Sequence, residues 1–172
     1  MNHKNIYLIG MMGSGKTVTG KALSGLLGRT FVDLDAEIQA KEGCSIPEIF
    51  AASGEPRFRD VESSVLEHFS KQNGLVIATG GGIVMREENV RLMKKTGEVV
   101  WLKASAESLW QRVRYSKDRP LLNKPDPLST LRQILNDRVS LYESACHWSV
   151  LTDGKIGEDV ASEIREMLRS RT

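Results

Sequence analysis

The chain is poor in the features that mark several classes of protein. Its 172 residues include only two cysteines, Cys44 and Cys146, too few for a disulfide framework or a cysteine-based metal cluster, and this predicts a reducing, cytoplasmic location. The formal net charge is only +2 and the basic residues form no run, which argues against nucleic acid as a partner. The apolar run at the N-terminus ends at Gly10, too soon for a signal peptide or a membrane span.

Repeats and low-complexity segments are also absent from the sequence. With 40% hydrophobic and 27% charged residues, the composition is that of an ordinary globular protein, and the length suffices to bury a core without disulfides. We therefore expect residues 1–172 to form a single domain, and a monomer in the absence of any sign of a large apolar patch.

One motif near the N-terminus carries most of the chemical information. Residues 10–17 read Gly-Met-Met-Gly-Ser-Gly-Lys-Thr, a complete G-x-x-x-x-G-K-[ST] loop, between a predicted buried strand at 5–9 and a predicted helix at 16–27. The glycines let N–H groups surround a phosphate at the start of the helix. Lys16 supplies a charge for the β- and γ-phosphates, and the Thr17 hydroxyl is suited to Mg²⁺. The sequence therefore predicts binding of a nucleoside triphosphate.

Apolar segments alternate with helical patterns along the rest of the chain. Further strands are predicted at 30–33, 75–79, 98–102 and 148–151, and further helices at 35–42, 45–54, 56–72, 87–95, 105–115, 128–145 and 158–169. This alternation predicts an α/β fold with a parallel sheet covered on both faces and a site at the carboxyl ends of the strands. The segment at about 114–127 contains three prolines and no periodicity, and we interpret it as a lid.

Two acidic residues follow the second predicted strand. Asp33 and Asp35 are two residues apart, so in an extended segment both carboxylates point to one side. Beside a magnesium nucleotide, one can hold the metal while the other accepts a proton from a substrate hydroxyl. The third predicted strand ends without a clear acidic residue, which favours Asp33 as the residue that holds the metal. The alternative is that Asp35 merely caps the following helix.

Gly80, Gly81 and Gly82 directly follow the third predicted strand. Three glycines exceed what a simple turn needs, so they indicate that a ligand approaches the backbone closely. A tight turn from strand to helix explains them equally well.

Arginines flank these segments. They are Arg57, Arg59, Arg112, Arg114, Arg119 and Arg138. The planar guanidinium group suits carboxylates and phosphates, and Arg119, inside the predicted lid, is placed to stabilise a transferring phosphoryl group. Individually, most such arginines are solvated surface charges, and Arg59 can simply pair with Glu55 or Glu62 along its own helix.

Taken in order, these motifs resemble the shikimate kinase family. The matching segments are Gly-Met-Met-Gly-Ser-Gly-Lys-Thr at 10–17, Phe-Val-Asp-Leu-Asp at 31–35, Phe-Arg-Asp-Val-Glu at 58–62, Gly-Gly-Gly at 80–82, Arg-Pro-Leu-Leu at 119–122 and Arg-Val-Ser-Leu-Tyr at 138–142. The resemblance implies transfer of the γ-phosphoryl of ATP to the 3-hydroxyl of shikimate, a step of aromatic amino-acid biosynthesis. It also implies a three-layer α/β/α fold like that of nucleoside-monophosphate kinases, with a five-stranded parallel sheet ordered 2-3-1-4-5 and a closing lid.

Matching positions also implies roles for individual residues. The residues implied for ATP are Gly13, Ser14, Gly15, Lys16, Thr17, Val18, Arg112, Arg119 and Lys155. Those implied for shikimate are Asp35, Arg59, Gly80, Gly81, Gly82 and Arg138, with much of the substrate-binding region at about 33–60. Asp35, Lys16 and Arg119 form the implied catalytic set, and Thr17 and Asp33 the implied Mg²⁺ ligands. Lys155 stands where many relatives carry a basic residue closely followed by proline, but here no proline follows.

Two other functions fit part of the pattern. A gluconate kinase or nucleoside-monophosphate kinase has the same architecture, and gluconate also offers a carboxylate and hydroxyls; the motifs at 58–62 and 119–122 favour shikimate instead. The other alternative is a regulatory domain that binds ATP without a second substrate. Asp35, Arg59 and Arg138 would have no role in such a domain, which argues against it.

Overall fold

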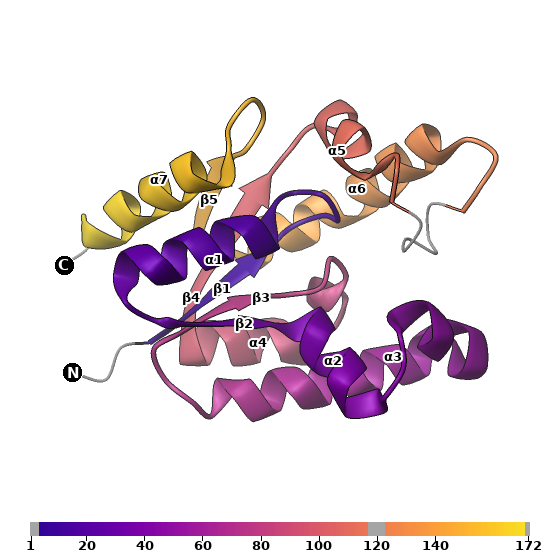
Figure 1. Cartoon of the computed structure of the whole chain (residues 1–172), viewed down its shortest axis with the longest axis horizontal. Helices are drawn as coiled ribbons and strands as arrows, with labels where there is room; N and C mark the ends of the chain where they lie inside the picture. The colour runs from indigo at the N-terminus through magenta and orange to yellow at the C-terminus, as the bar shows by residue number, and fades with distance from the viewer. Residues whose placement is uncertain (1–3, 117–122, 171–172) are drawn as a thin grey trace.

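The computed structural model describes residues 4–116 and 123–170, and a parallel five-stranded sheet lies at its centre (Figure 1). The strands are β1 (Asn5–Ile9), β2 (Thr30–Asp33), β3 (Leu75–Ala78), β4 (Gly97–Lys103) and β5 (Trp148–Leu151). Their order is β2-β3-β1-β4-β5, and every neighbouring pair is parallel. The strand order expected from the family resemblance is therefore confirmed.

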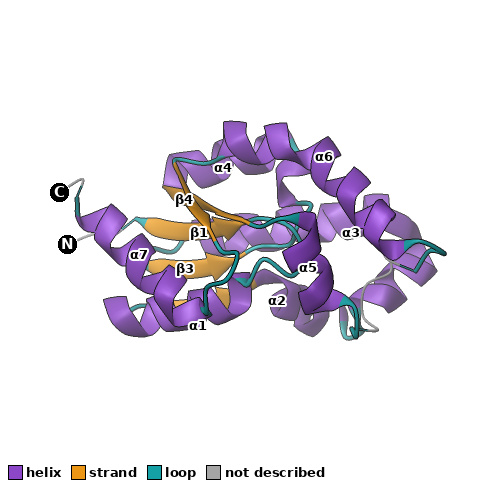
Figure 2. Cartoon of the chain, turned by 90° about the horizontal axis from the view of Figure 1, so that it is seen from above, coloured by secondary structure: helices purple, strands orange, loops and turns teal. Residues whose placement is uncertain are grey.

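Helices cover both faces of the sheet. They are α1 (Lys16–Leu27), α2 (Leu34–Glu42), α3 (Ile46–Ser70), α4 (Glu87–Thr96), α5 (Ala106–Val113), α6 (Pro127–Ala145) and α7 (Gly157–Arg169), with a short 3₁₀ helix, η1 (Ile83–Met85). Figure 2 shows α1 and α7 on one side of the strands and α4 and α6 on the other. None of the helices in the described ranges is long and apolar enough to cross a membrane.

The central strand explains how the two layers form. All five residues of β1 are buried, and successive side chains point to opposite faces. Ile6 and Leu8 belong to the core beneath α1 and α7, whereas Tyr7 and Ile9 belong to the larger core beneath α3, α4 and α6. A strand buried on both faces needs helices on both sides, which gives the predicted three-layer arrangement.

The two helices predicted at 45–54 and 56–72 form one kinked element, α3. Gly54 has a φ of 76° and a ψ of 174°, and Pro56, which lacks an N–H donor, follows it. The predicted capping box is confirmed: the Ser45 hydroxyl accepts from the Glu48 N–H, and the Glu48 carboxylate accepts from the Ser45 N–H.

The prediction that Asp33 and Asp35 share one side of an extended segment is wrong. Strand β2 ends at Asp33 and helix α2 begins at Leu34, so Asp35 lies in the first turn of that helix. Asp33 is the cap, because its Oδ1 accepts hydrogen bonds from the N–H groups of Asp35 at 3.1 Å and Ala36 at 3.4 Å. The alternative that Asp35 caps the helix is therefore wrong as well.

The carboxyl ends of the strands lie at one edge of the sheet. In Figure 1 β1, β2 and β3 run towards the right, with α5 and α6 above their ends and α2 and α3 below. The loop at 10–15 follows β1, Asp33 ends β2, and the glycines at 80–82 come shortly after β3. Since β2 and β1 both pair with β3, this topology gathers all three motifs at the same edge.

Candidate active site

The phosphate-binding loop joins β1 to α1 in a conformation that needs glycine. Gly13 has a φ of 78°, and a Cβ at this position would lie 2.6 Å from the Val113 side chain. Gly15 is the N-cap of α1 and leaves the first N–H groups of the helix without a side-chain cap in the described structure. The Lys16 ammonium lies over the loop, donating to the carbonyls of Gly10 and Met11, both at 2.8 Å. This arrangement of N–H groups and positive charge suits a phosphate chain.

A cavity of about 320 Å³ opens at the phosphate-binding loop. Six of the residues predicted to bind ATP line it, namely Gly13, Gly15, Lys16, Thr17, Val18 and Arg112. Arg112 connects the loop to the segment after β5, since it donates to the carbonyl of Gly13 at 3.1 Å and to that of Thr152 at 2.9 Å. We call this space the nucleotide cavity.

Three other residues predicted to bind ATP are placed differently. Ser14 is buried and lines neither the nucleotide cavity nor the one beside it. Lys155 does not line the nucleotide cavity, and its ammonium forms a 2.6 Å ion pair with Glu163 of α7. Arg119 and the rest of the segment 117–122, which is the middle of the predicted lid, lie outside the described residues.

Thr17 and Asp33 are side by side, as their predicted role at Mg²⁺ requires. The Thr17 hydroxyl donates to Oδ2 of Asp33 at 2.7 Å, and both residues line the nucleotide cavity. A hydroxyl and a carboxylate are oxygen ligands of the kind that Mg²⁺ prefers. The described residues contain no cluster of three or more His, Cys, Asp or Glu side chains suited to a metal. The pair fits a magnesium ion that takes its remaining ligands from phosphates and water.

A second cavity, of about 410 Å³, adjoins the first. All six residues predicted to bind shikimate line it: Asp35, Arg59, Gly80, Gly81, Gly82 and Arg138. Its apolar wall includes Phe50 and Phe58, whose ring centroids are 4.8 Å apart. We call this space the acceptor cavity. Its size and its few convergent polar groups suit a small polar molecule.

The two cavities share three lining residues, Met12, Asp35 and Gly81. Asp35 therefore lies at the junction between the space beside the phosphate-binding loop and the space that holds the arginines. A carboxylate at such a junction can accept a hydrogen bond from a hydroxyl group in one cavity while that hydroxyl lies close to a phosphate chain in the other.

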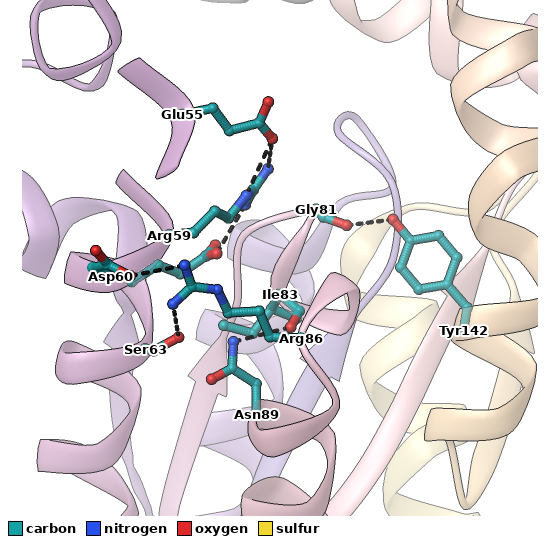
Figure 3. Close-up of polar contacts among 10 residues, drawn as sticks. Glu55, Arg59, Asp60, Ser63, Gly81, Ile83, Arg86, Asn89 and Tyr142 are labelled. Atoms are coloured by element: carbon teal, nitrogen blue, oxygen red, sulfur yellow. Dashed lines mark hydrogen bonds and ion pairs between the residues drawn. The ribbon is translucent and has the colours of Figure 1, made fainter. Parts of the chain in front are cut away.

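Arg59 forms ion pairs with two carboxylates of its own helix, and Figure 3 shows the pair with Glu55. Its Nη1 donates to Glu62 at 2.8 Å, and its Nη2 donates to Glu55 at 3.0 Å. Both pairings anticipated from the sequence are therefore present at once, and Arg59 nevertheless lines the acceptor cavity.

Burial affects the two partners of this ion pair differently. Burial raises the pKa of Glu62, whose side chain is 0% exposed, and the attraction of Arg59 offsets this only in part. Burial alone would lower the pKa of Arg59, which is 10% exposed, but the carboxylates of Glu62 and Glu55 raise it overall. The pairing of Glu62 with Arg59 was anticipated only as an alternative to a binding role for Arg59, whereas in the structure the paired Arg59 also lines the acceptor cavity. The spacing of three residues on one helix was the available signal.

The glycine turn lies directly against this ion pair. A Cβ at Gly80 would be 2.6 Å from Oε1 of Glu62, and a Cβ at Gly82 would be 2.5 Å from Nη1 of Arg59. The close approach that three glycines indicated is thus made by the protein's own side chains. The turn leads into η1, which the sequence did not predict, through a hydrogen bond from the Ile83 N–H to the Gly80 carbonyl at 3.2 Å.

Helix α6 closes the opposite wall of the acceptor cavity. Arg138 is 7% exposed and lines the cavity, as predicted. Tyr142, one helical turn later, donates from its hydroxyl to the Gly81 carbonyl at 2.5 Å (Figure 3). The segment 138–142 is one of the motifs that match the family, but a role was predicted only for Arg138. Tyr142 was missed, although its spacing of four residues puts it on the same helix face.

Comparison with known proteins gives a consistent picture. The family model described as "Shikimate kinase" matches residues 12–169. The chain is 44% identical over 169 residues to a shikimate kinase of Symbiobacterium thermophilum, covering 97% of both chains, and 46% identical over 153 residues to one of Ruegeria pomeroyi, covering 89% of this chain and 78% of that one.

Solved structures agree with this match. The shikimate kinase of Acinetobacter baumannii in complex with shikimate superposes with a TM-score of 0.97 at 40% identity, covering 99% of this chain and 95% of that one. The shikimate kinase of Aquifex aeolicus gives a TM-score of 0.85 at 39% identity, covering 97% of both chains. With a phosphate-binding loop, an adjoining arginine-lined cavity and these matches over nearly its whole length, the chain belongs to the shikimate kinase family, whose members transfer phosphate to an alcohol acceptor.

Proposed function

We propose that this chain transfers the γ-phosphoryl of ATP to the 3-hydroxyl of shikimate, giving shikimate 3-phosphate and ADP. The observation that carries this proposal is the pair of adjoining cavities with Asp35 at their junction. One cavity is built for phosphates and the other presents two arginines and a carboxylate. That combination matches an acceptor that has a carboxylate at one end and hydroxyls at the other.

Arg59 and Arg138 are the proposed contacts for the acceptor's carboxylate. Both are nearly buried, and both line the acceptor cavity. A guanidinium group with two parallel donors binds a carboxylate with defined orientation, and a site shielded from water strengthens the attraction. Binding the carboxylate at this end leaves the ring hydroxyls to face the junction, where Asp35 lies.

Asp35 is the proposed base that orients the acceptor hydroxyl and takes its proton. Lys16 of the phosphate-binding loop is the proposed positive charge on the β- and γ-phosphates, and Arg119 of the predicted lid is proposed to join it there. Magnesium held by Thr17 and Asp33 would neutralise charge on the phosphates. In this scheme the protein acts chiefly by placing the two substrates in line and balancing charge. The monomeric state and the cytoplasmic location stay predictions.

A coupled assay of ADP release tests the proposal. The protein is supplied with ATP and Mg²⁺ and with shikimate, gluconate or no acceptor. We expect turnover with shikimate only. Turnover with gluconate and not with shikimate would show that the chain is a kinase for a different sugar acid. ATP binding without turnover on either acceptor would favour a regulatory nucleotide-binding domain.

A further inference from the structure

Tyr142 is a buried tyrosine that connects α6 to the glycine turn. Its side chain is among the fully buried ones, its ring stacks on Trp101 with centroids 5.6 Å apart, and its hydroxyl donates to the Gly81 carbonyl at 2.5 Å (Figure 3). Burial raises the pKa of Tyr142 to about 12, with the charge of Arg138 opposing the rise. The phenol therefore keeps its proton and stays a hydrogen-bond donor throughout the physiological pH range.

The hydrogen bond fixes the orientation of one peptide plane. The Gly81 carbonyl belongs to the peptide that joins Gly81 to Gly82, and the described chain contains no cis peptide. In a trans peptide the C=O and N–H point in opposite directions, so the Gly82 N–H points away from Tyr142. Gly82 itself packs against Arg59, on the other side of the turn. The tyrosine thus determines which side of this peptide faces the acceptor cavity.

The hydrogen bond from Tyr142 matters because glycine residues adopt many backbone conformations of similar energy. Gly80, Gly81 and Gly82 have no Cβ to restrict φ and ψ, so this peptide can rotate at little cost unless something holds it. In η1, which follows the turn, the N–H of Ile83 donates to the Gly80 carbonyl at 3.2 Å and the N–H of Met85 donates to the Gly82 carbonyl at 3.0 Å. These bonds hold the two outer glycine carbonyls, and Tyr142 holds the middle one.

Arg138 depends on the same glycine. It precedes Tyr142 by four residues on α6, so both side chains project from one face of the helix. Its Nη1 would be 3.6 Å from a Cβ at Gly81, which is ordinary contact. The backbone that Tyr142 holds is therefore also the surface on which the Arg138 guanidinium lies.

We propose that Tyr142 is a positioning residue for the acceptor: its hydroxyl holds the Gly81–Gly82 peptide, and through it the wall between Arg59 and Arg138. Tyr142 lines neither cavity, so it acts through these groups and not by touching the acceptor. The inference rests on the proposed function for the identity of the acceptor, but the positioning of the turn does not depend on it.

The test compares Y142F with Y7F. Tyr7 is a matched control, because it is also fully buried, its hydroxyl makes a 2.7 Å hydrogen bond with Thr96, and it lines neither cavity. Each variant removes one buried hydroxyl and keeps the ring. Loss of one hydrogen bond changes an equilibrium constant, here the dissociation constant of the acceptor, by a factor of up to about 10. We expect Y142F to raise the KM and Kd for shikimate by about that factor, and Y7F to change neither.

A second measurement separates this inference from the proposed function. Amide hydrogen exchange of the segment 78–86 reports the mobility of the turn whatever the acceptor is. We expect faster exchange there in Y142F and not in Y7F. Unchanged exchange, or an equal rise of the shikimate KM in both variants, would overturn the positioning role. Faster exchange in Y142F together with a wild-type protein that does not phosphorylate shikimate would keep the positioning role and reject the proposed acceptor.

Discussion

Replacing Gly82 with alanine is the most direct perturbation of the acceptor cavity. The φ of Gly82 is −98°, which alanine adopts without strain, so the backbone itself need not change. The added Cβ would be 2.5 Å from Nη1 and 2.6 Å from Cζ of Arg59, whereas ordinary contact begins at 3.4 Å. The whole effect of the substitution therefore falls on the position of one guanidinium group.

The magnitude follows from how far that group must move. Nη2 would be closer still, so restoring ordinary contact needs a shift of about 1 Å, and Arg59 cannot shift without straining its bonds to Glu62 and Glu55 at 2.8 and 3.0 Å. A misplacement of roughly 1 Å in a group that orients a substrate can cost about 10²-fold in rate. We therefore expect Gly82→Ala to lower kcat/KM for shikimate about 100-fold, or about 2.7 kcal/mol of transition-state stabilisation.

The assay is steady-state ADP release with each substrate varied in turn. The KM for ATP should stay at its wild-type value, because Gly82 does not line the nucleotide cavity. Gly25→Ala is the matched control: no atom lies within 4 Å of a Cβ there, and Gly25 is in helix α1. This control should keep wild-type kinetics and gain about 0.5–1 kcal/mol of stability. A shikimate KM and kcat within twofold of wild type in Gly82→Ala would refute the tight placement of Arg59.

Three further predictions concern the same cavity. Asp35→Asn should lower kcat by about 10²–10⁴-fold while ATP affinity is kept, because the proton acceptor is lost; near-normal turnover in rapid-quench experiments would contradict its role as base. Arg138→Lys should raise the shikimate KM sharply, because a point charge cannot replace two parallel donors, and an unchanged KM would remove Arg138 from carboxylate binding. The raised pKa of Glu62 means that its contribution to stability is fully present below the unfolded value, near 4.5, and is lost as the pH rises through the folded pKa. Thermal melts of Glu62→Gln should therefore show a smaller decline than wild type as the pH rises through that window, and parallel declines would show that this carboxyl does not titrate as described.

Features made by neighbouring residues could be predicted from the sequence. The phosphate-binding loop at 10–17 and the capping box at 45–48 depend on backbone and side-chain bonds within a few residues, so the pattern suffices. The alternation of strands and helices follows from local periodicity, and it correctly predicted a parallel sheet covered on both faces. The strand order came from the family resemblance, which rests on motifs spread over the whole chain.

Other features depend on contacts that local pattern cannot show. The position of Asp35 depends on how the chain continues after β2. The Asp33 carboxylate accepts hydrogen bonds from two N–H groups, so helix α2 starts at Leu34, one residue before Asp35, and the strand does not continue. The contact of Arg112 with Thr152 joins residues 40 apart, and that of Tyr142 with Gly81 joins residues 61 apart. Each is a hydrogen bond that exists only after the sheet has brought the two segments together. The sequence by itself thus determined the chemistry that the chain carries, and the tertiary structure decided which buried side chains hold it in place, because burial and long-range hydrogen bonds are properties of the packed molecule.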